Sequence, residues 1–269
     1  MNKVITITSI IVFLLWGKVT LSQNSIEEDK NYQVGFTASL TTIFSKPQTV
    51  NLESDGAGVG FHGGVAFKYF FLKNNNIGIT TGLFFDAESF KLDYLPNGVQ
   101  DSAFYNYTDK EILQFKDGQS GSETVLLSYR KYKPIYLTVP VGMQFQTKLI
   151  GYFKYFGRFG INGSFLLNTK VNDQVANAST DLSTFSTAHE LEDMNTKNEL
   201  EFIKSSIFVG AGMNWFFSGN TCLHAEVQYN FGFTNVFKGE SRSLYKSNFQ
   251  PYSEKMTQDM LVLKVGVLF

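Results

Sequence analysis

The dominant pattern of this chain is an alternation of apolar residues with small or polar ones, which has a period of two. In one stretch Val59, Phe61 and Val65 fall on one face of an extended chain, while Gly60 and His62 fall on the other. Successive side chains of a β-strand point to opposite faces, so the pattern predicts strands with one apolar face each. The alternation recurs in eight stretches, at 32–40, 59–71, 77–89, 135–147, 153–167, 203–217, 223–233 and 261–269. An all-β protein is therefore expected.

The charged residues inside these stretches test which environment each face meets, because the faces are assigned from the apolar residues alone. These charged residues are Lys68, Asp86, Glu88, Lys154, Arg158, Lys204, Glu226 and Lys264. Each falls on the face opposite the apolar stripe. A Lys or Arg that faces lipid at the bilayer midplane costs about 2–4 kcal/mol. We therefore expect the apolar stripe to face lipid. The competing interpretation is a soluble lipocalin-like barrel, in which the two faces would be reversed.

The connections between the stretches alternate in length. Short ones fall near 73–76, 148–152 and 218–220, and long polar ones at 41–58, 90–134, 168–202 and 234–260. Outer-membrane barrels alternate brief periplasmic turns with extended external loops. An open sheet edge in lipid would leave backbone groups unpaired, so the last stretch must pair with the first. The pattern predicts an eight-stranded antiparallel up-and-down transmembrane β-barrel with short periplasmic turns and long extracellular loops.

The two ends of the chain are typical of a protein exported to an outer membrane. Residues 1–22 combine a short basic front, an apolar run and a polar stretch, which predicts a signal peptide. The apolar run is shorter than the roughly 17–25 residues that a spanning helix needs. Residues 23–269 then form the barrel domain. The terminal Phe269 is expected to be the signal that the barrel insertion machinery reads during biogenesis.

Composition excludes several other classes of protein. The 23 Lys and Arg against 24 Asp and Glu give a formal charge of −1, and no basic surplus indicates a nucleic-acid partner. A polytopic helical membrane protein is excluded, because its spans need about 20 consecutive apolar residues and this sequence has no such run. Cys222 is the only cysteine, which rules out an intramolecular disulfide and a cysteine-based zinc site. We expect neither a cofactor nor a metal.

Three stretches resemble strands of the PorT-like outer-membrane β-barrel proteins of the Bacteroidetes. They are YLTVPVGMQF at 136–145, Gly-Ala-Gly at 210–212 and EVQYNFGFTNV at 226–236. The final strand, with Gly266 and Phe269, is similar as well, whereas Gln228 stands where such proteins commonly have Arg. The resemblance implies a barrel fold and a link to secretion or gliding machinery. The long insertions mark this chain as a divergent member.

Counting residues from the predicted turns places Lys68, Glu226 and Lys264 at one level inside the barrel. We expect a Glu226–Lys264 pair between adjacent strands, and with Arg158 these residues form the predicted interior polar cluster. The interior of an eight-stranded barrel is just filled by side chains. The cluster is therefore interpreted as a plug of mutually neutralised charges. A proton or ion path is the alternative.

Three histidines are the candidates for catalysis on outer-membrane lipid: His62, His189 and His224. No nucleophile pattern accompanies any of them, and a triad is defined by geometry that spacing across strands does not supply. We therefore expect no catalytic residue. An interior histidine is more often a hydrogen-bonded filler.

The external loops carry two further candidates. The stretch Thr187–Met194 predicts a short helix capped at Ser186 or Thr187, and its His and acidic residues suggest an incidental cation site. Loop aromatics suited to stacking on carbohydrate are Tyr94, Phe104, Tyr105, Tyr107 and Phe115.

The function expected from these observations is that of a non-enzymatic scaffold or partner-binding protein in the Gram-negative outer membrane. It would act through its extracellular loops or its periplasmic rim. The partners expected are outer-membrane lipid, the barrel insertion machinery and other envelope proteins. A lipid-modifying enzyme and a narrow channel are the alternatives.

Overall fold

The computed structural model describes residues 31–71, 76–94, 102–114, 122–179, 182, 184–196 and 199–269. The predicted signal peptide lies outside the described residues. The strands are β1 (Tyr32–Pro47), β2 (Leu52–Ser54), β3 (Gly58–Phe70), β4 (Ile77–Tyr94), β5 (Ala103–Thr108), β6 (Glu111–Ile112), β7 (Glu123–Gln146), β8 (Phe153–Asn177), β9 (His189–Asn195), β10 (Ile203–Ser218), β11 (Thr221–Gly232), β12 (Gly239–Tyr245), β13 (Pro251–Glu254) and β14 (Met256–Leu268). Within the described ranges, no helix is long and apolar enough to cross a membrane.

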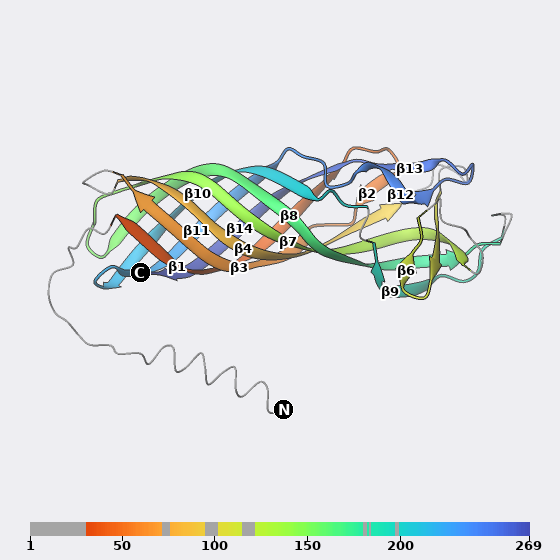
Figure 1. The fold of residues 1–269 in the computed structure, drawn as a ribbon, viewed down its shortest axis with the longest axis horizontal. Helices are drawn as coiled ribbons and strands as arrows, with labels where there is room; N and C mark the ends of the chain where they lie inside the picture. Colours follow the sequence, from red (N-terminus) through yellow and green to blue (C-terminus); the bar gives the residue numbers. More distant parts are fainter. Residues whose placement is uncertain are drawn as a thin grey trace, which may run out of the picture.

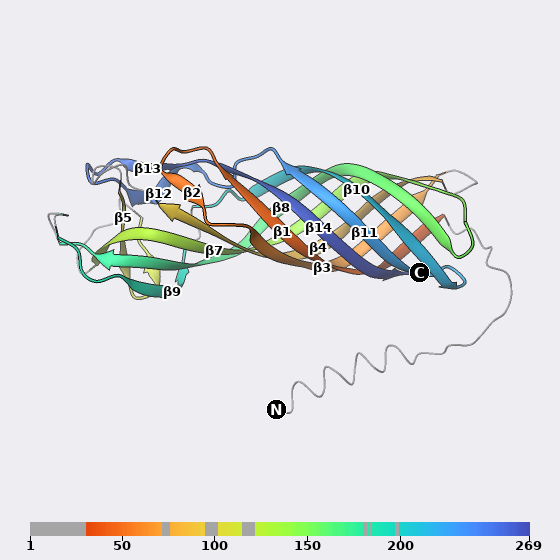
Figure 2. The same ribbon diagram turned by 180° about the vertical axis from the view of Figure 1, so that it is seen from behind.

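A closed circuit of antiparallel pairings forms a barrel. It runs through β1, β3, β4, β7, β8, β10, β11 and β14 and returns to β1. Figures 1 and 2 show these strands tilted around one long axis. Phe36 on β1 lies opposite Val267 on β14, so the predicted pairing of the last stretch with the first is confirmed. Closure leaves the barrel without an open edge.

The outer surface of the barrel carries an apolar band, which we define by its exposed side chains. These are Phe36, Leu40, Val59, Val65, Leu83, Phe85, Val141, Phe145, Phe159, Ile161, Ile207, Val209, Val227, Phe231, Leu263 and Val265. The charged residues of the predicted stretches are buried inside the barrel, apart from the half-buried Lys154. The predicted assignment of faces is confirmed. The reversed faces of a lipocalin-like barrel are not found in the described strands.

Small residues on the inner face make room for large ones. Gly64 on β3 lies opposite Phe84 on β4, whose ring fills the barrel interior. A Cβ atom at Gly64 would approach the Leu83 carbonyl oxygen to 2.1 Å and the Phe84 Cα to 2.7 Å. Glycine is therefore required at this position for the two strands to pair around the buried ring.

The two ends of the barrel differ. At one end, which we call the short-turn end, brief connections join β3 to β4, β7 to β8 and β10 to β11. At the other, the extended end, strands continue well past the apolar band and β2, β5, β6, β9, β12 and β13 are added (Figures 1 and 2). The long segments expected to be solvated loops are thus largely β-structure. That expectation was wrong because their polar residues alternate with apolar ones that pack together.

The largest hydrophobic core of the described residues lies at the extended end. It includes Leu52, Phe90, Leu92, Tyr94, Tyr105, Val125, Leu127, Tyr132, Val171, Val175, Met194, Leu200, Phe237, Leu244, Tyr252 and Met256. These residues come from segments far apart in the sequence. Their mutual burial stabilises strands that local sequence alone would not.

The helix predicted at Thr187–Met194 is not formed, since His189–Asn195 is the strand β9. It pairs antiparallel with the outer part of β8, where Val171 lies opposite Met194. This part of β8 extends beyond its pairing with β10 and would otherwise present unpaired backbone groups. Tertiary pairing, together with burial of Met194 in the core, overrides the local helix signal.

Candidate functional site

The predicted interior cluster lies in the half of the barrel nearer the short-turn end. Glu226 is directly opposite Lys264 in the β11–β14 register, and their charged atoms are 3.9 Å apart. The closer partner of Glu226 is Arg158, whose Nε donates to Oε1 while its Nη2 donates to Gln228 Oε1 at 2.5 Å. His224 completes the group, with Nε2 at 3.2 Å from Glu226 Oε2. One carboxylate is thus surrounded by cationic and polar groups from three strands.

Lys68 is buried in the same half of the barrel but joins no ion pair among the described residues. Its Nζ lies 4.9 Å from the centre of the Phe156 ring, within the distance of a cation–π contact. Of the four residues of the predicted cluster, Arg158, Glu226 and Lys264 therefore lie together, whereas Lys68 lies against the Phe156 ring.

A second ion pair crosses the interior closer to the extended end. Lys204 Nζ donates to both carboxylate oxygens of Glu88 at 2.8 Å, and it lies 4.3 Å from the centre of the Tyr136 ring. Both charged side chains are buried. Between this pair and the Glu226 group lies a polar cavity of about 40 Å³. That volume has room for about three water molecules.

His62 contacts two residues, Thr41 and Asp86, that the sequence spacing did not predict as its neighbours. Its Nε2 is 2.9 Å from Thr41 Oγ1, and its Nδ1 is 3.4 Å from Asp86 Oδ1. A hydroxyl, an imidazole and a carboxylate in this order can activate a nucleophile. The three residues come from β1, β3 and β4, which are neighbours in the barrel. Thr41 is buried, however, and the adjoining cavity is too small for an acyl chain.

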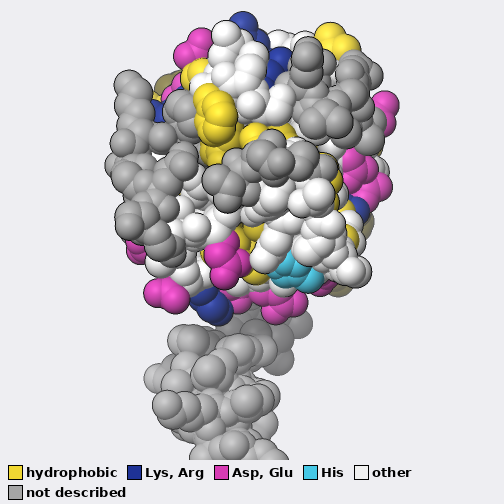
Figure 3. All heavy atoms as spheres, turned by 90° about the vertical axis from the view of Figure 1, so that its right-hand side faces the viewer, with side chains coloured by type: hydrophobic (Ala, Val, Ile, Leu, Met, Phe, Trp, Pro, Cys, Tyr) yellow, Lys and Arg dark blue, Asp and Glu magenta, His cyan; other side chains and the backbone are white. Residues whose placement is uncertain are grey.

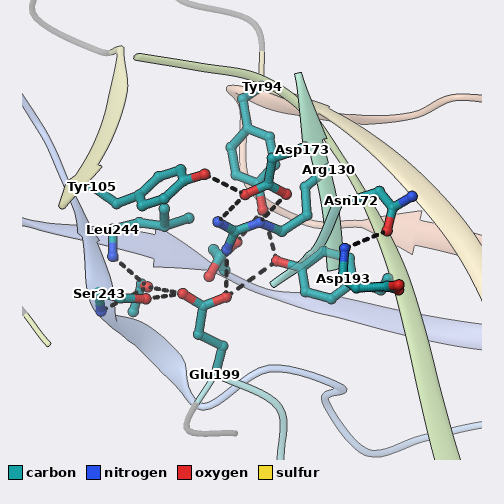
Figure 4. A network of polar contacts seen from close by, with 12 residues as sticks. Tyr94, Tyr105, Arg130, Asn172, Asp173, Asp193, Glu199, Ser243 and Leu244 are labelled. Carbon is teal, nitrogen blue, oxygen red and sulfur yellow. Dashed lines mark hydrogen bonds and ion pairs between the residues drawn. The ribbon is translucent and has the colours of Figure 1, made fainter. Parts of the chain in front are cut away.

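A polar network lies within the core of the extended end (Figure 4). Arg130 on β7 forms two hydrogen bonds to Asp173 and one, from Nη1, to Glu199 Oε2 at 2.7 Å. The Tyr105 hydroxyl donates to Asp173 at 2.7 Å, and Ser243 donates to Glu199. We call this group, together with the residues of the next paragraph, the extended-end network. Sequence reasoning missed it, because its members lie in segments predicted to be loops.

A third carboxyl group adjoins the extended-end network without a cation of its own. The Tyr94 hydroxyl lies 2.9 Å from that of Tyr132 and donates to Glu254 Oε1 at 2.6 Å. The other oxygen of Glu254 is buried and has no hydrogen-bond partner among the described residues. Burial first, and then the nearby Glu199 carboxylate, raise the pKa of Glu254 to about 8. Burial and the neighbouring carboxylate therefore favour the protonated form of Glu254.

The remaining sequence candidates are dispersed. Tyr94, Phe104 and Tyr105 are buried, so they are not open to a carbohydrate, and Phe115 lies outside the described residues. His189 and its acidic neighbours lie on β9. Across the described ranges, no group of three or more His, Cys, Asp or Glu side chains is arranged to hold a metal ion. Phe269 ends the chain beside β1, where its backbone exchanges hydrogen bonds with Val34.

A family model described as outer membrane protein beta-barrel domain matches residues 21–238. No curated protein sequence matches this chain. Among solved structures, OprG from Pseudomonas aeruginosa is 11% identical and covers 91% of this chain and 98% of its own, with a TM-score of 0.49. Ail of Yersinia pestis is 12% identical, with 89% and 100% covered and a TM-score of 0.34. The outer membrane protease OmpT from Escherichia coli is 9% identical, with 91% and 99% covered and a TM-score of 0.34.

Proposed function

Because this chain belongs to the outer membrane protein beta-barrel domain family, we propose that it is a non-catalytic binding protein of the cell envelope. It is an outer-membrane β-barrel protein, and the Gram-negative outer membrane is its location. The apolar band lies in the lipid, with the short-turn end towards the periplasm and the extended end outside. In this proposal the barrel is an anchor, and the extended end captures a partner.

The observation that carries the proposal is the hydrophobic core of the extended end. External segments that merely connect strands need no core, and solvated loops would have none. Here Leu92, Tyr132 and Val171 are completely buried beyond the band, in a core shared by strands from four external segments. A core of this kind holds the outer surface in one conformation. A preorganised surface binds a partner without the entropic cost of ordering loops.

The interior of the barrel supports an anchor rather than a channel. The Arg158–Glu226 and Lys204–Glu88 pairs join side chains across the interior at two levels. Only a small cavity separates them. An ion passing through would have to break buried pairs whose separated charges are costly to leave unpaired.

The Thr41–His62–Asp86 arrangement favours the lipid-modifying enzyme as the second candidate function. The purified protein should be assayed for hydrolysis of long-chain and short-chain acyl esters, with His62→Ala as the control. On the present proposal, neither protein hydrolyses either ester above the background rate. Hydrolysis that requires His62 would replace the binding role by an enzymatic one.

Site-specific crosslinking in intact cells tests the binding role. A photoreactive phenylalanine analogue replaces Phe185 at the extended end, Tyr152 at the short-turn end or Phe159 in the apolar band, all of which are exposed. We expect discrete protein adducts from position 185 and none from position 159, which faces lipid. Adducts from position 152 alone would contradict capture by the extended end and would assign it to the periplasmic rim. Absence of protein adducts from both ends would contradict the proposal.

The PorT-like resemblance supplies one class of partner to look for among the adducts. Components of secretion or gliding machinery are envelope proteins, and a rigid external or periplasmic rim suits their assembly. Mass spectrometry of the adducts identifies the class directly. Recovery of envelope proteins unrelated to either machinery would remove this link and leave the general binding role.

A further inference from the structure

A pocket of about 400 Å³ opens at the extended end, among the outermost parts of β7, β8 and β12. We call it the tip pocket, and it is lined by Ser122, Glu123, Thr124, Asn177, Ala178, Leu182, Tyr245 and Phe249. Its volume falls within the range of about 300–1,000 Å³ that is usual for small-molecule sites. Figure 3 views this end and shows hydrophobic side chains emerging between polar ones.

The apolar side of the tip pocket is the end of an aromatic stack. Phe185, Phe104, Tyr245 and Phe249 follow one another, with successive ring centres 6.3, 6.2 and 5.7 Å apart and interplanar angles of 23°, 27° and 16°. The two middle rings are buried, whereas Phe185 and Phe249 are 41% and 53% exposed. Of the two exposed rings, only Phe249 lines the pocket. The two buried rings orient the Phe249 ring, which remains accessible to solvent.

The backbone also constrains this side of the pocket. Phe249 has a φ of 59° and Leu182 a φ of 55°, a left-handed conformation that bulky residues rarely adopt. Both residues line the pocket. Backbone strain of this kind persists where surrounding structure enforces it, and it clusters at binding sites.

The polar side of the pocket is rich in hydrogen-bond acceptors. The Tyr107 hydroxyl donates to Glu123 Oε2 at 2.8 Å, and Asn177 Nδ2 donates to the same oxygen at 3.4 Å. These neutral donors orient the carboxylate through Oε2, and Oε1 has no hydrogen-bond partner among the described residues, so it is open to a ligand. The Thr124 hydroxyl donates to Asn106, so it too presents an acceptor. A matching ligand therefore has one flat apolar face and an edge that donates hydrogen bonds.

We propose that the tip pocket binds a pyranose ring of a neutral saccharide. One face of a pyranose presents C–H groups, which stack on the Phe249 ring, and its hydroxyl edge donates to Glu123. An ammonium ligand would use the carboxylate and the ring but would leave the other acceptors without donors. The inference rests on the proposed function, because it gives the binding surface of the extended end a ligand class.

The test is saturation-transfer NMR on the purified full chain in tetraethylene glycol monooctyl ether, a detergent that has no sugar group to compete. The compounds are the methyl glycosides of glucose, galactose, mannose and N-acetylglucosamine, with choline as a cationic comparison. We expect saturable binding of at least one glycoside. Phe249→Ala should weaken it roughly fivefold to tenfold, as the loss of one aromatic contact does. Phe185→Ala, at the opposite exposed end of the stack, should change it less than about twofold.

Three outcomes overturn the proposal. They are the absence of binding by every glycoside, whether or not choline binds, equal weakening by Phe249→Ala and Phe185→Ala, and full binding by Glu123→Leu. Unaltered heat-modifiable migration of each variant shows that it is folded. Crosslinking from position 185 is scored in parallel. Protein adducts without glycoside binding would reject this inference alone, whereas glycoside binding without adducts would reject capture of a protein partner.

Discussion

Arg130 and Asp173 form two parallel hydrogen bonds, Nε to Oδ1 at 2.8 Å and Nη2 to Oδ2 at 2.7 Å, between side chains that are completely buried. The two residues are directly opposite each other on β7 and β8. This bidentate ion pair links β7 and β8, the two longest strands, at a point beyond the apolar band. Because Arg130 also binds Glu199, it connects them to the segment that precedes β10.

Removing the guanidinium should destabilise the extended end strongly. Arg130→Met leaves the carboxylates of Asp173 and Glu199 buried without a cation, a change that typically costs about 3–5 kcal/mol. The measurement is urea unfolding followed by tryptophan fluorescence, together with proteolysis of the external segments. Lys133→Met is the control, since it removes only the exposed contact with Asp193 at 3.6 Å and should cost less than about 1 kcal/mol. Similar losses of unfolding free energy in the two variants would contradict a stabilising role for the Arg130–Asp173 pair.

Stability should fall as pH rises through neutrality, in part because of Glu254. Burial raises its pKa from 4.5 to about 8, so the folded protein keeps a proton that the unfolded chain releases between these values. The stabilisation is fully present below about pH 4.5 and is lost as pH rises through about 8, by at most about 1.4 kcal/mol per pH unit. Glu254→Gln should flatten this part of the profile and stabilise the protein at about pH 9. An unchanged slope of unfolding free energy against pH would show that Glu254 is ionised throughout.

Breaking the interior cluster should reduce stability without opening a conducting path. Glu226→Leu leaves Arg158 and Lys264 buried without their carboxylate, which should cost about 3–5 kcal/mol. The double variant Arg158→Met/Glu226→Leu should recover much of this loss, because the closest pair is then replaced by apolar side chains. Unfolding midpoints test the first part and planar-bilayer recordings the second. Ion currents that arise in either variant would overturn the interpretation of the cluster as a plug.

A charge on the apolar band should impair membrane insertion in proportion to its depth. Val265 on β14 is 62% exposed within the band, so Val265→Arg should cost about 2–4 kcal/mol of folding free energy in vesicles. Val50 is 89% exposed but lies beyond the band, between β1 and β2, so Val50→Arg should change stability by less than about 0.5 kcal/mol. Folding titrations into phospholipid vesicles compare the two. An equal effect would place Val265 outside the lipid.

The barrel could be predicted because its pattern is local. Alternation along each strand, the parity of charges such as Lys204 and Glu226, and the lengths of the connections are all visible in a single sequence. The extended end was predicted as loops, because polar residues such as Lys131 and Lys133 are frequent there. Its strands depend on a core assembled from segments more than 100 residues apart, such as Leu92 and Tyr252, which local patterns do not reveal.

The candidate sites likewise contain some contacts that local sequence predicts and others that depend on the folded structure. Glu226 and Lys264 lie on adjacent strands, so counting from the turn and the chain end was enough to set them opposite each other. Arg158 reaches Glu226 from β8, across the intervening β10, which depends on side-chain length and on the width of the barrel. The contacts of His62 with Thr41 and Asp86 require the register of three strands at once.

Local sequence patterns were sufficient to predict a barrel and the face that meets lipid, because apolar matching to the bilayer acts on each side chain separately. Only the folded structure reveals that the external segments share a core, that Arg130 and Asp173 meet inside it, and that Phe249 ends an aromatic stack beside Glu123. These features depend on packing between distant segments, in which each contact stabilises the fold only when the neighbouring contacts have also formed.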